Sequence, residues 1–259
     1  MRILLLLLSL LIFLGMKPKE KKSTILRSFY TEMKALEKPL KVDVFAAVNS
    51  TIFSTTSSSF NVTIPATTVN NLLVIGIYTL TNPAINLSSI NDNGGNTYAI
   101  TSSVTSGTNT FKIIMAYAVQ TVSATAVTIT HAGSINSEVA INEYSGGYTT
   151  NAAVHNQTQT GSGNSANLSV STMTLAGSGL VVACLGKDYS PGGQITFGSN
   201  YTLYGTPDGS RMSLQHRLVA TTSETAPANV SFSQNWVEIA VGFKSIIPQK
   251  SIRLSAFKP

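Results

Sequence analysis

Hydrophobic and polar residues alternate in short blocks over most of this chain. From residue 44 onward many runs carry apolar side chains at every second position, as in Val127 and Ile129 against Thr128 and Thr130. Gly, Asn, Ser and Pro separate the runs. This pattern is typical of β-strands joined by turns. It predicts strands at 44–53, 59–64, 71–80, 86–90, 97–103, 110–118, 126–131, 138–144, 153–159, 166–171, 179–185, 201–205, 211–219, 228–233 and 237–244.

These predicted strands indicate an all-β fold. No helical pattern long enough for a parallel crossover lies between them, so we expect antiparallel pairing. About 200 residues of such strands fit two packed sheets, and residues 44–244 are predicted to form an antiparallel jelly-roll β-sandwich. The spacing follows no clean period, so we expect neither a propeller nor a solenoid.

Two segments precede the sandwich. Residues 1–22 read as a hydrophobic signal or membrane anchor with a lysine-rich flank, because Arg2 precedes an apolar run over residues 3–16. Its anchoring side chains are Leu4, Leu5, Leu6, Leu7, Leu8, Leu11 and Phe13. Three fates stay open for the run: cleavage, retention in a membrane, or a true translation start at Met16.

Residues 23–43 are predicted to hold an amphipathic helix and a linker. Phe29, Met33, Leu36 and Leu40 recur at helical spacing over residues 23–40. A docking helix and a helix packed on the domain's edge are both consistent with this pattern. Residues 245–259 form a basic C-terminal tail.

Composition and charge narrow the function classes. Hydrophobic residues make up 43% of the chain, which is too many for a disordered protein, and charged residues only 11%. The net charge of +6 belongs to the two ends, because residues 44–244 hold five basic and seven acidic residues. Nucleic-acid binding needs basic side chains gathered on a folded surface, so we expect no nucleic-acid partner.

Cysteine and histidine offer little chemistry. The single Cys184 lies inside an apolar run and is expected to be inert packing, and it excludes an intrachain disulfide. His131, His155 and His216 stand far apart without zinc spacing, and we expect them to face solvent on strands.

Three ordered motifs carry a family resemblance. They are Ile90-Asn91-Asp92-Asn93-Gly94-Gly95-Asn96-Thr97-Tyr98, then Ala116-Tyr117-Ala118 with Val127-Thr128-Ile129-Thr130, and Glu143-Tyr144-Ser145-Gly146. Together they resemble the concanavalin A-like lectin/glucanase jelly roll found in bacterial surface proteins and phage structural proteins. The resemblance spans residues 44–244 and implies a fold that hosts binders, enzymes and structural subunits.

The resemblance suggests one catalytic alternative. Related glucanases carry a Glu-x-Asp-x-x-Glu strand, and here Glu138 and Glu143 have the outer spacing while Ala140 stands at the Asp position. A spacing of five places the two carboxylates on opposite faces of a regular strand. We therefore expect no catalytic residues, and we expect Glu143 to be tied to turn amides near Ser145 and Gly146.

Two binding sites are also predicted. Asp92, Asn93 and Asn96 offer oxygen ligands for a structural calcium ion, although a tight turn explains the same residues. Apart from that ion no cofactor is expected. A glycan site would use aromatic and acidic residues in or beside turns, namely Tyr144, Tyr148, Tyr189, Tyr201, Tyr204, Asp188 and Asp208.

These observations favour a non-enzymatic structural or attachment subunit displayed on a phage virion or a bacterial envelope. The expected location is the virion or the extracellular cell surface, with residues 3–16 in a membrane if they are retained. The expected partners are copies of the chain or other virion or envelope subunits. A lectin-like carbohydrate-binding module is the alternative, and a glucanase-type glycoside hydrolase is the second.

Overall fold

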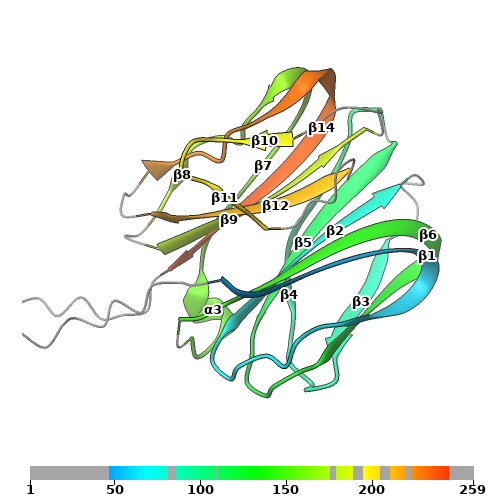
Figure 1. Cartoon of the computed structure of the whole chain (residues 1–259), viewed down its shortest axis with the longest axis vertical. Coiled ribbons are helices and arrows are strands. Elements are labelled where there is room, and N and C mark those ends of the chain that lie inside the picture. Colours follow the sequence, from blue (N-terminus) through cyan, green and yellow to red (C-terminus); the bar gives the residue numbers. More distant parts are fainter. Residues whose placement is uncertain are drawn as a thin grey trace, which may run out of the picture. The chain divides into compact units, whose positions relative to one another are not determined.

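The structure is a computed structural model that describes residues 47–80, 86–108, 110–146, 148–175, 179–188, 195–204, 211–219 and 223–244. This part of the chain is nearly all β and its sheets are antiparallel (Figure 1). The helix expected at 23–40, the apolar run 3–16 and the tail 245–259 lie outside the described residues. Among the described residues, no helix is long and apolar enough to cross a membrane.

The described strands fall into two halves of the chain. The first half contains β1 (Ala47–Thr63), β2 (Leu72–Leu80), β3 (Leu87–Asp92), β4 (Ala99–Thr105), β5 (Phe111–Val119) and β6 (Ala126–Tyr144). A four-residue helix, α3 (Asn151–Val154), leads into the second half. That half contains β7 (His155–Leu168), β8 (Met173–Thr174), β9 (Gly179–Lys187), β10 (Ile195–Phe197), β11 (Thr202–Tyr204), β12 (Met212–Val219), β13 (Ser223–Glu224) and β14 (Ala228–Lys244).

Each half forms one six-stranded sheet, and these two sheets, A and B, repeat the same pairing pattern; β8 and β13 of the second half form a separate two-stranded sheet. Sheet A has the order β1-β6-β2-β5-β4, with β3 paired to β6. Sheet B has the equivalent order β7-β14-β9-β12-β11, with β10 paired to β14. In Figure 1 the strands of the first half (blue to green) lie below those of the second half (yellow-green to red). The described chain therefore contains a structural repeat, which the sequence analysis did not find.

One hydrophobic core joins the two sheets. It combines side chains of β2, β5 and β6 with side chains of β9, β12 and β14, among them Val74, Ile113, Val182 and Ile239. The described part is thus β-sandwich-like. Its connectivity differs from the jelly roll expected from the sequence, because each sheet comes from one continuous half of the chain, whereas jelly-roll strands alternate between sheets.

Glycines allow the closest contacts across this core. A Cβ atom on Gly76 of β2 would lie 2.8 Å from the Cys184 Sγ of β9, and one on Gly186 of β9 would lie 2.6 Å from the Ile113 Cγ2 of β5. Such distances are shorter than van der Waals contact. Larger residues at these positions would push the sheets apart.

The outer face of each sheet is also covered. The β1–β6 ribbon bends where its register shifts between Ser57 and Ser59, and its end folds back with β3 over sheet A (Figure 1). A separate hydrophobic cluster covers the outer face of sheet B. It includes residues from the ends of β7 and β14 and the adjoining loop, namely Leu168, Val170, Ala228 and Val230. Central strands β2 and β9 are consequently buried on both faces, which explains their nearly continuous apolar sequences.

These bends explain where the strand predictions were wrong. The sequence predicted two strands in each of four places where the structure has one long strand: β1, β6, β7 and β14. In β1 the predicted break contains the register shift at Ser57 and Ser59. Polar residues at a bend resemble a turn in sequence, although the backbone continues its pairing through them.

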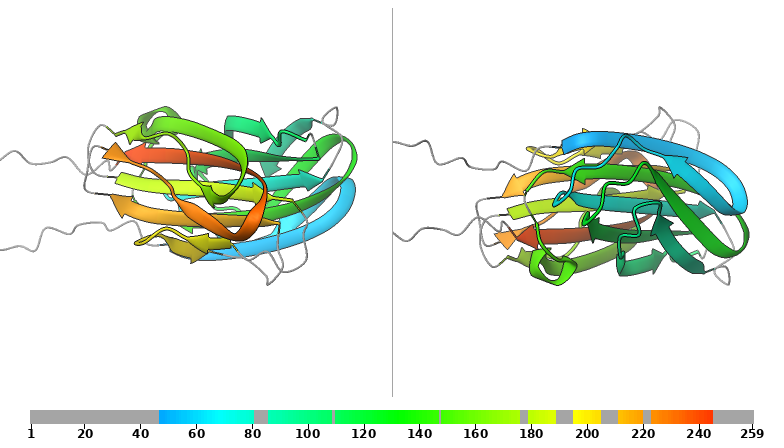
Figure 2. Two further views of the ribbon diagram at one scale, coloured as in Figure 1. Left: turned by 90° about the horizontal axis from the view of Figure 1, so that it is seen from above. Right: turned by 90° about the horizontal axis from the view of Figure 1, so that it is seen from below.

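The first and last residues of the described chain, Ala47 and Lys244, lie at the same end of the two sheets. Ala47 pairs with Tyr144, Tyr144 pairs with Leu72, and Lys244 pairs with Gly179. We call this the terminal end, and the end with Leu80, Phe111 and Lys187 the distal end. A nine-residue strand such as β2 separates them by about 30 Å. Figure 2 shows that the strands of both sheets lie roughly along one common axis, with alternating directions.

The glycine contact predicts an energetic coupling between the sheets. Replacing Gly76 with Ala should lower the free energy of unfolding by about 1–3 kcal/mol because the new methyl group meets Cys184. In a Cys184→Ala background the same replacement should cost less, since the Sγ atom is gone. Urea unfolding of the four proteins in this cycle measures the coupling. Strictly additive effects would contradict the facing arrangement of β2 and β9, and Gly107→Ala, in open space, serves as the control.

Candidate functional site

The outer face of sheet B buries polar side chains that have few hydrogen-bond partners. Ser213 and Gln215 of β12 and Glu238 of β14 are each 0% exposed. The Ser213 hydroxyl and both polar atoms of the Gln215 amide make no hydrogen bond with any described residue, and a backbone hydrogen bond with Val170 acts on the Glu238 carboxyl group. Buried polar groups with so few partners destabilise a fold, which makes this part of sheet B a candidate site. We call these three residues the inner polar group.

The equivalent positions of the repeat are apolar. In sheet B, Leu185 pairs with Ser213 on one side and with Glu238 on the other. The equivalent row of sheet A has Ile77 between Ile114 and Val139, all in an apolar cluster.

The next row repeats the contrast. Gln215 pairs with Ala183 in sheet B, and Ala116 pairs with Ile75 in sheet A. The pairing pattern is therefore compatible with apolar residues at these positions, and sheet B has polar ones instead.

Burial sets the charge of Glu238. Its removal from water raises the pKa of the carboxyl group well above its usual range, and the nearby Val170 backbone offsets only part of this effect. Glu238 is therefore a neutral acid at pH values where an exposed glutamate is ionised. In that form it can both donate and accept a hydrogen bond.

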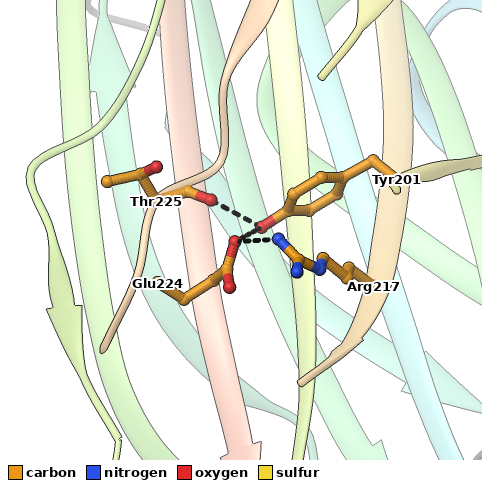
Figure 3. A network of polar contacts seen from close by, with 4 residues as sticks. All are labelled: Tyr201, Arg217, Glu224 and Thr225. Carbon is orange, nitrogen blue, oxygen red and sulfur yellow. Dashed lines mark hydrogen bonds and ion pairs between the residues drawn. The ribbon is translucent and has the colours of Figure 1, made fainter. Parts of the chain in front are cut away.

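A satisfied polar network lies beside the inner polar group (Figure 3). The Arg217 guanidinium donates to the Glu224 carboxylate at 2.8 Å, and the Tyr201 hydroxyl lies 3.3 Å from the same oxygen and 2.8 Å from the Thr225 carbonyl. Arg217 also lies 5.9 Å from the centre of the Tyr201 ring. Burial, followed by the charge of Glu224, raises the pKa of Tyr201.

This network ties covering segments to the sheet. Tyr201 precedes β11, and Glu224 and Thr225 belong to the β12–β14 connection, while Arg217 projects from β12. The Arg217 side chain keeps 30% of its surface exposed and Glu224 only 6%. The network marks the solvent side of a region whose interior holds Gln215 and Glu238.

Chemically, this region offers hydrogen bonds and no activated nucleophile. A neutral carboxyl group, an amide and a hydroxyl are groups that recognise polar, uncharged molecules. Among the described residues, no three His, Cys, Asp or Glu side chains are grouped to hold a metal ion.

The two carboxylates of the glucanase alternative lie apart. Val139 and Ile141, which share the face of Glu143, belong to the outer core of sheet A, whereas Ala140, which shares the face of Glu138, belongs to the core between the sheets. The pairing of β6 with β2 is regular over this stretch, so no bulge brings the carboxylates together.

Each carboxylate is held by hydrogen bonds. Glu143 is 1% exposed and accepts from the Thr68 amide and from Asn71 Nδ2, both at 2.7 Å. Glu138 accepts from the Arg211 backbone amide at 3.2 Å. These contacts fit structural roles.

The proposed glycan residues whose side chains are described do not gather into one surface. Tyr144 and Tyr148 are 0% exposed and belong to the core between the sheets, so neither ring offers a face to a sugar. Tyr201 is half-buried in the network described above. Asp188, at the distal end, accepts from Thr110 at 2.9 Å and from Asn235 at 2.7 Å. Tyr189, Asp208 and the side chain of Tyr204 lie outside the described residues.

The proposed calcium ligands use their oxygens within the chain. Asp92 accepts from the amides of Gly94 and Asn96, from Asn96 Nδ2 and from the Tyr98 hydroxyl, at 2.8–3.0 Å. The side-chain oxygen of Asn96 accepts from the Thr121 and Val122 amides.

Asn93 completes this loop in the same way, because its side-chain oxygen accepts from the Thr125 and Ala126 amides. A metal ion would have to displace these hydrogen bonds. The loop therefore fits a self-contained turn better than a calcium site, and Gly95 supplies its one positive φ, 75°.

Two histidines expected to face solvent are buried instead. His131 is 3% exposed, with Nε2 placed 3.2 Å from the Ser137 hydroxyl. His216 is 8% exposed and its ring meets the edge of Tyr144, and burial lowers the pKa of His216 to about 4. Cys184 is buried as expected, and its burial raises the thiol pKa.

Charged residues gather at the distal end. Lys112, Glu138, Lys187, Asp188 and Arg211 all lie where the strands of both sheets reach that end. Lys187 is only 1% exposed; burial lowers the pKa of its amine, opposed by the charges of Glu138 and Asp188. In a chain with so few charges, this grouping sets the distal end apart.

Sequence reasoning missed the inner polar group. Ser213, Gln215 and Arg217 alternate with apolar residues, and this signal reads as the solvent-exposed face of an ordinary strand. Only the cover over sheet B reveals that the polar face is buried. Comparison with known protein families, with curated proteins and with solved structures finds no match to this chain.

The neutral state of Glu238 predicts a pH-dependent effect. The folded chain keeps this proton where the unfolded carboxyl, with an ordinary pKa near 4.5, has lost it, so the group lowers stability as the pH rises above that value. Glu238→Gln should raise the free energy of unfolding by at least about 1 kcal/mol at pH 7.5, and much less at pH 4. Urea unfolding of both proteins at the two pH values measures this. An equal effect at both pH values would contradict a neutral Glu238.

The hydrogen-bonded loop predicts that calcium does not stabilise the fold. A site filled at 100 times its Kd would add about 2.7 kcal/mol, which raises the Tm of a domain of this size by several degrees. We expect no such rise when millimolar calcium replaces a chelator, whereas Asp92→Ala should lower the Tm in both buffers. A calcium-dependent increase that Asp92→Ala abolishes would establish the metal site instead.

Proposed function

We propose that this chain is a non-enzymatic structural or attachment subunit displayed on a phage virion or a bacterial envelope, where it assembles with copies of itself or with neighbouring subunits. The observation that carries the proposal is the position of the first and last described residues. Ala47 and Lys244 lie at the terminal end, so a tether through either flanking segment attaches there. The distal end, with its charged residues, then points outward.

The surface chemistry supports display. The exposed side chains of β1 are mostly Ser, Thr and Asn, and they keep a surface soluble with little charge. The acidic residues that enzymes of the resembled family would use are separated on β6 and occupied by backbone amides. A relation to concanavalin A-like modules stays a proposal, supported only by antiparallel sheets with a shared core, because the connectivity differs from that of a jelly roll.

Carbohydrate binding is the second candidate, favoured by one observation. Sheet B buries Ser213, Gln215 and Glu238 where sheet A buries Ile114, Ala116 and Val139. Hydroxyl, amide and neutral carboxyl groups suit the hydroxyls of a sugar, which would reach these fully buried side chains only if the covering segments moved away. A secreted, soluble chain would favour this candidate over an assembly subunit.

Fractionation of the native source tests the proposal. Mass spectrometry of cell-free particles, envelope and cytosol should find the chain in particles or envelope, with the peptide Met1–Gly15 retained. Recovery only from the cytosol would contradict display. A soluble secreted chain that starts near residue 17 would favour the carbohydrate-binding candidate.

Thiol labelling tests the orientation. Cys184 is buried, so a single new cysteine is the reactive thiol among the described residues. On intact particles or cells, Gly107→Cys at the distal end should react with a membrane-impermeant maleimide as fast as in purified protein. Val122→Cys, which replaces a side chain 52% exposed at the terminal end, is the matched variant and should react more slowly. Faster reaction of Val122→Cys would reverse the proposed orientation.

A further inference from the structure

Strand β1 is a long edge strand with an open side. It spans 17 residues and, among the described residues, pairs only with β6. No described loop makes a backbone hydrogen bond to it. In the part of the chain that the structure describes, no strand or loop pairs with the backbone groups on its other side, as at an edge open to another strand.

The strand has register shifts between Ala47 and Asn49 and between Ser57 and Ser59, but it lacks the other features that usually protect an edge. Proteins block edge pairing with charges, with prolines, or with very short edge strands. The sequence Ala47–Thr63 contains no charged residue and no proline. Val48 and Ile52, at 47% and 37% exposure, add two apolar side chains to this edge.

The other described edge strands differ. In sheet B, β11 has only three residues. Strand β4 of sheet A and β7 of sheet B lie next to each other, so each edge faces part of the other sheet. Strand β1 is the long edge that the described fold leaves uncovered.

We propose that β1 pairs with β1 of a second copy of this chain, antiparallel about a two-fold axis, which makes sheet A continuous across two chains. This inference rests on the proposed function, because display at one surface brings copies side by side. It adds the partner and the contact.

The chemistry of the strand favours a copy of itself as its partner. Antiparallel pairing about a two-fold axis places the Ser- and Thr-rich centre of β1 opposite the same residues, where hydroxyl pairs form without like-charge repulsion. Ile52 and Val48 of each copy would be covered by the other. A charged partner strand would find no counter-charge along β1.

Cysteine cross-linking in the full-length chain tests the proposal. Single cysteines replace Ser50, Ile52, Ser54, Thr56 and Ser58, which are exposed on one face of β1. A short bismaleimide is applied to the native particles or membranes. A two-fold pairing predicts a cross-linked dimer with one position of highest yield and lower yields on both sides, because only residues near the axis meet their own copy.

Matched controls lie on the equivalent strand of the repeat. Thr160→Cys and Ser162→Cys are exposed on β7, and they should give several-fold less dimer. Equal yields on β1 and β7, or cross-links only to a protein of another mass, would overturn the proposal. A cytosolic chain that still cross-links through β1 would refute display and leave this contact standing.

Discussion

The contact of β2 with β9 is the constraint on which the other features depend. Gly76 faces Cys184 and Gly186 faces Ile113 at distances that leave no room for a side chain, so the sheets lie as close as their backbones allow. Strands this deeply buried need apolar residues on both faces. Their outer faces then need covers, which the bent ribbons β1–β6 and β7–β14 supply. The long, bent strands are thus a consequence of a core buried from both sides.

The repeat allows equivalent positions of the two sheets to be compared. Both halves share one pairing pattern, and both bury an outer cluster. Sheet A fills its cluster with residues such as Ile114 and Val139, whereas sheet B places Ser213 and Glu238 at the equivalent positions. Because buried polar groups with few partners destabilise a fold, this row of sheet B is the part of the repeat that its apolar equivalent does not explain.

Periodicity was enough to predict the fold class and most strands, because alternation directly reflects which side chains are buried. It failed at the bends, where Ser57 and Ser59 read as a turn, and at the repeat, whose halves share topology but few residues. Periodicity also could not predict the candidate site, for a related reason. Gln215 and Glu238 sit on alternating positions that normally face water, and only the cover over sheet B buries them. The prediction for Tyr144 was wrong in the opposite sense. Its position beside a predicted turn indicated an exposed aromatic ring, but the ring is buried in the core.

The central claim is that the chain is displayed with its terminal end attached and its distal end outward. Electron cryo-tomography of native particles and envelopes, labelled with gold-conjugated antibody against residues 47–244, tests it most directly. The account predicts gold on the outer surface, at repeated positions along it. Gold confined to the interior of cells, with bare particles and envelopes, would contradict it.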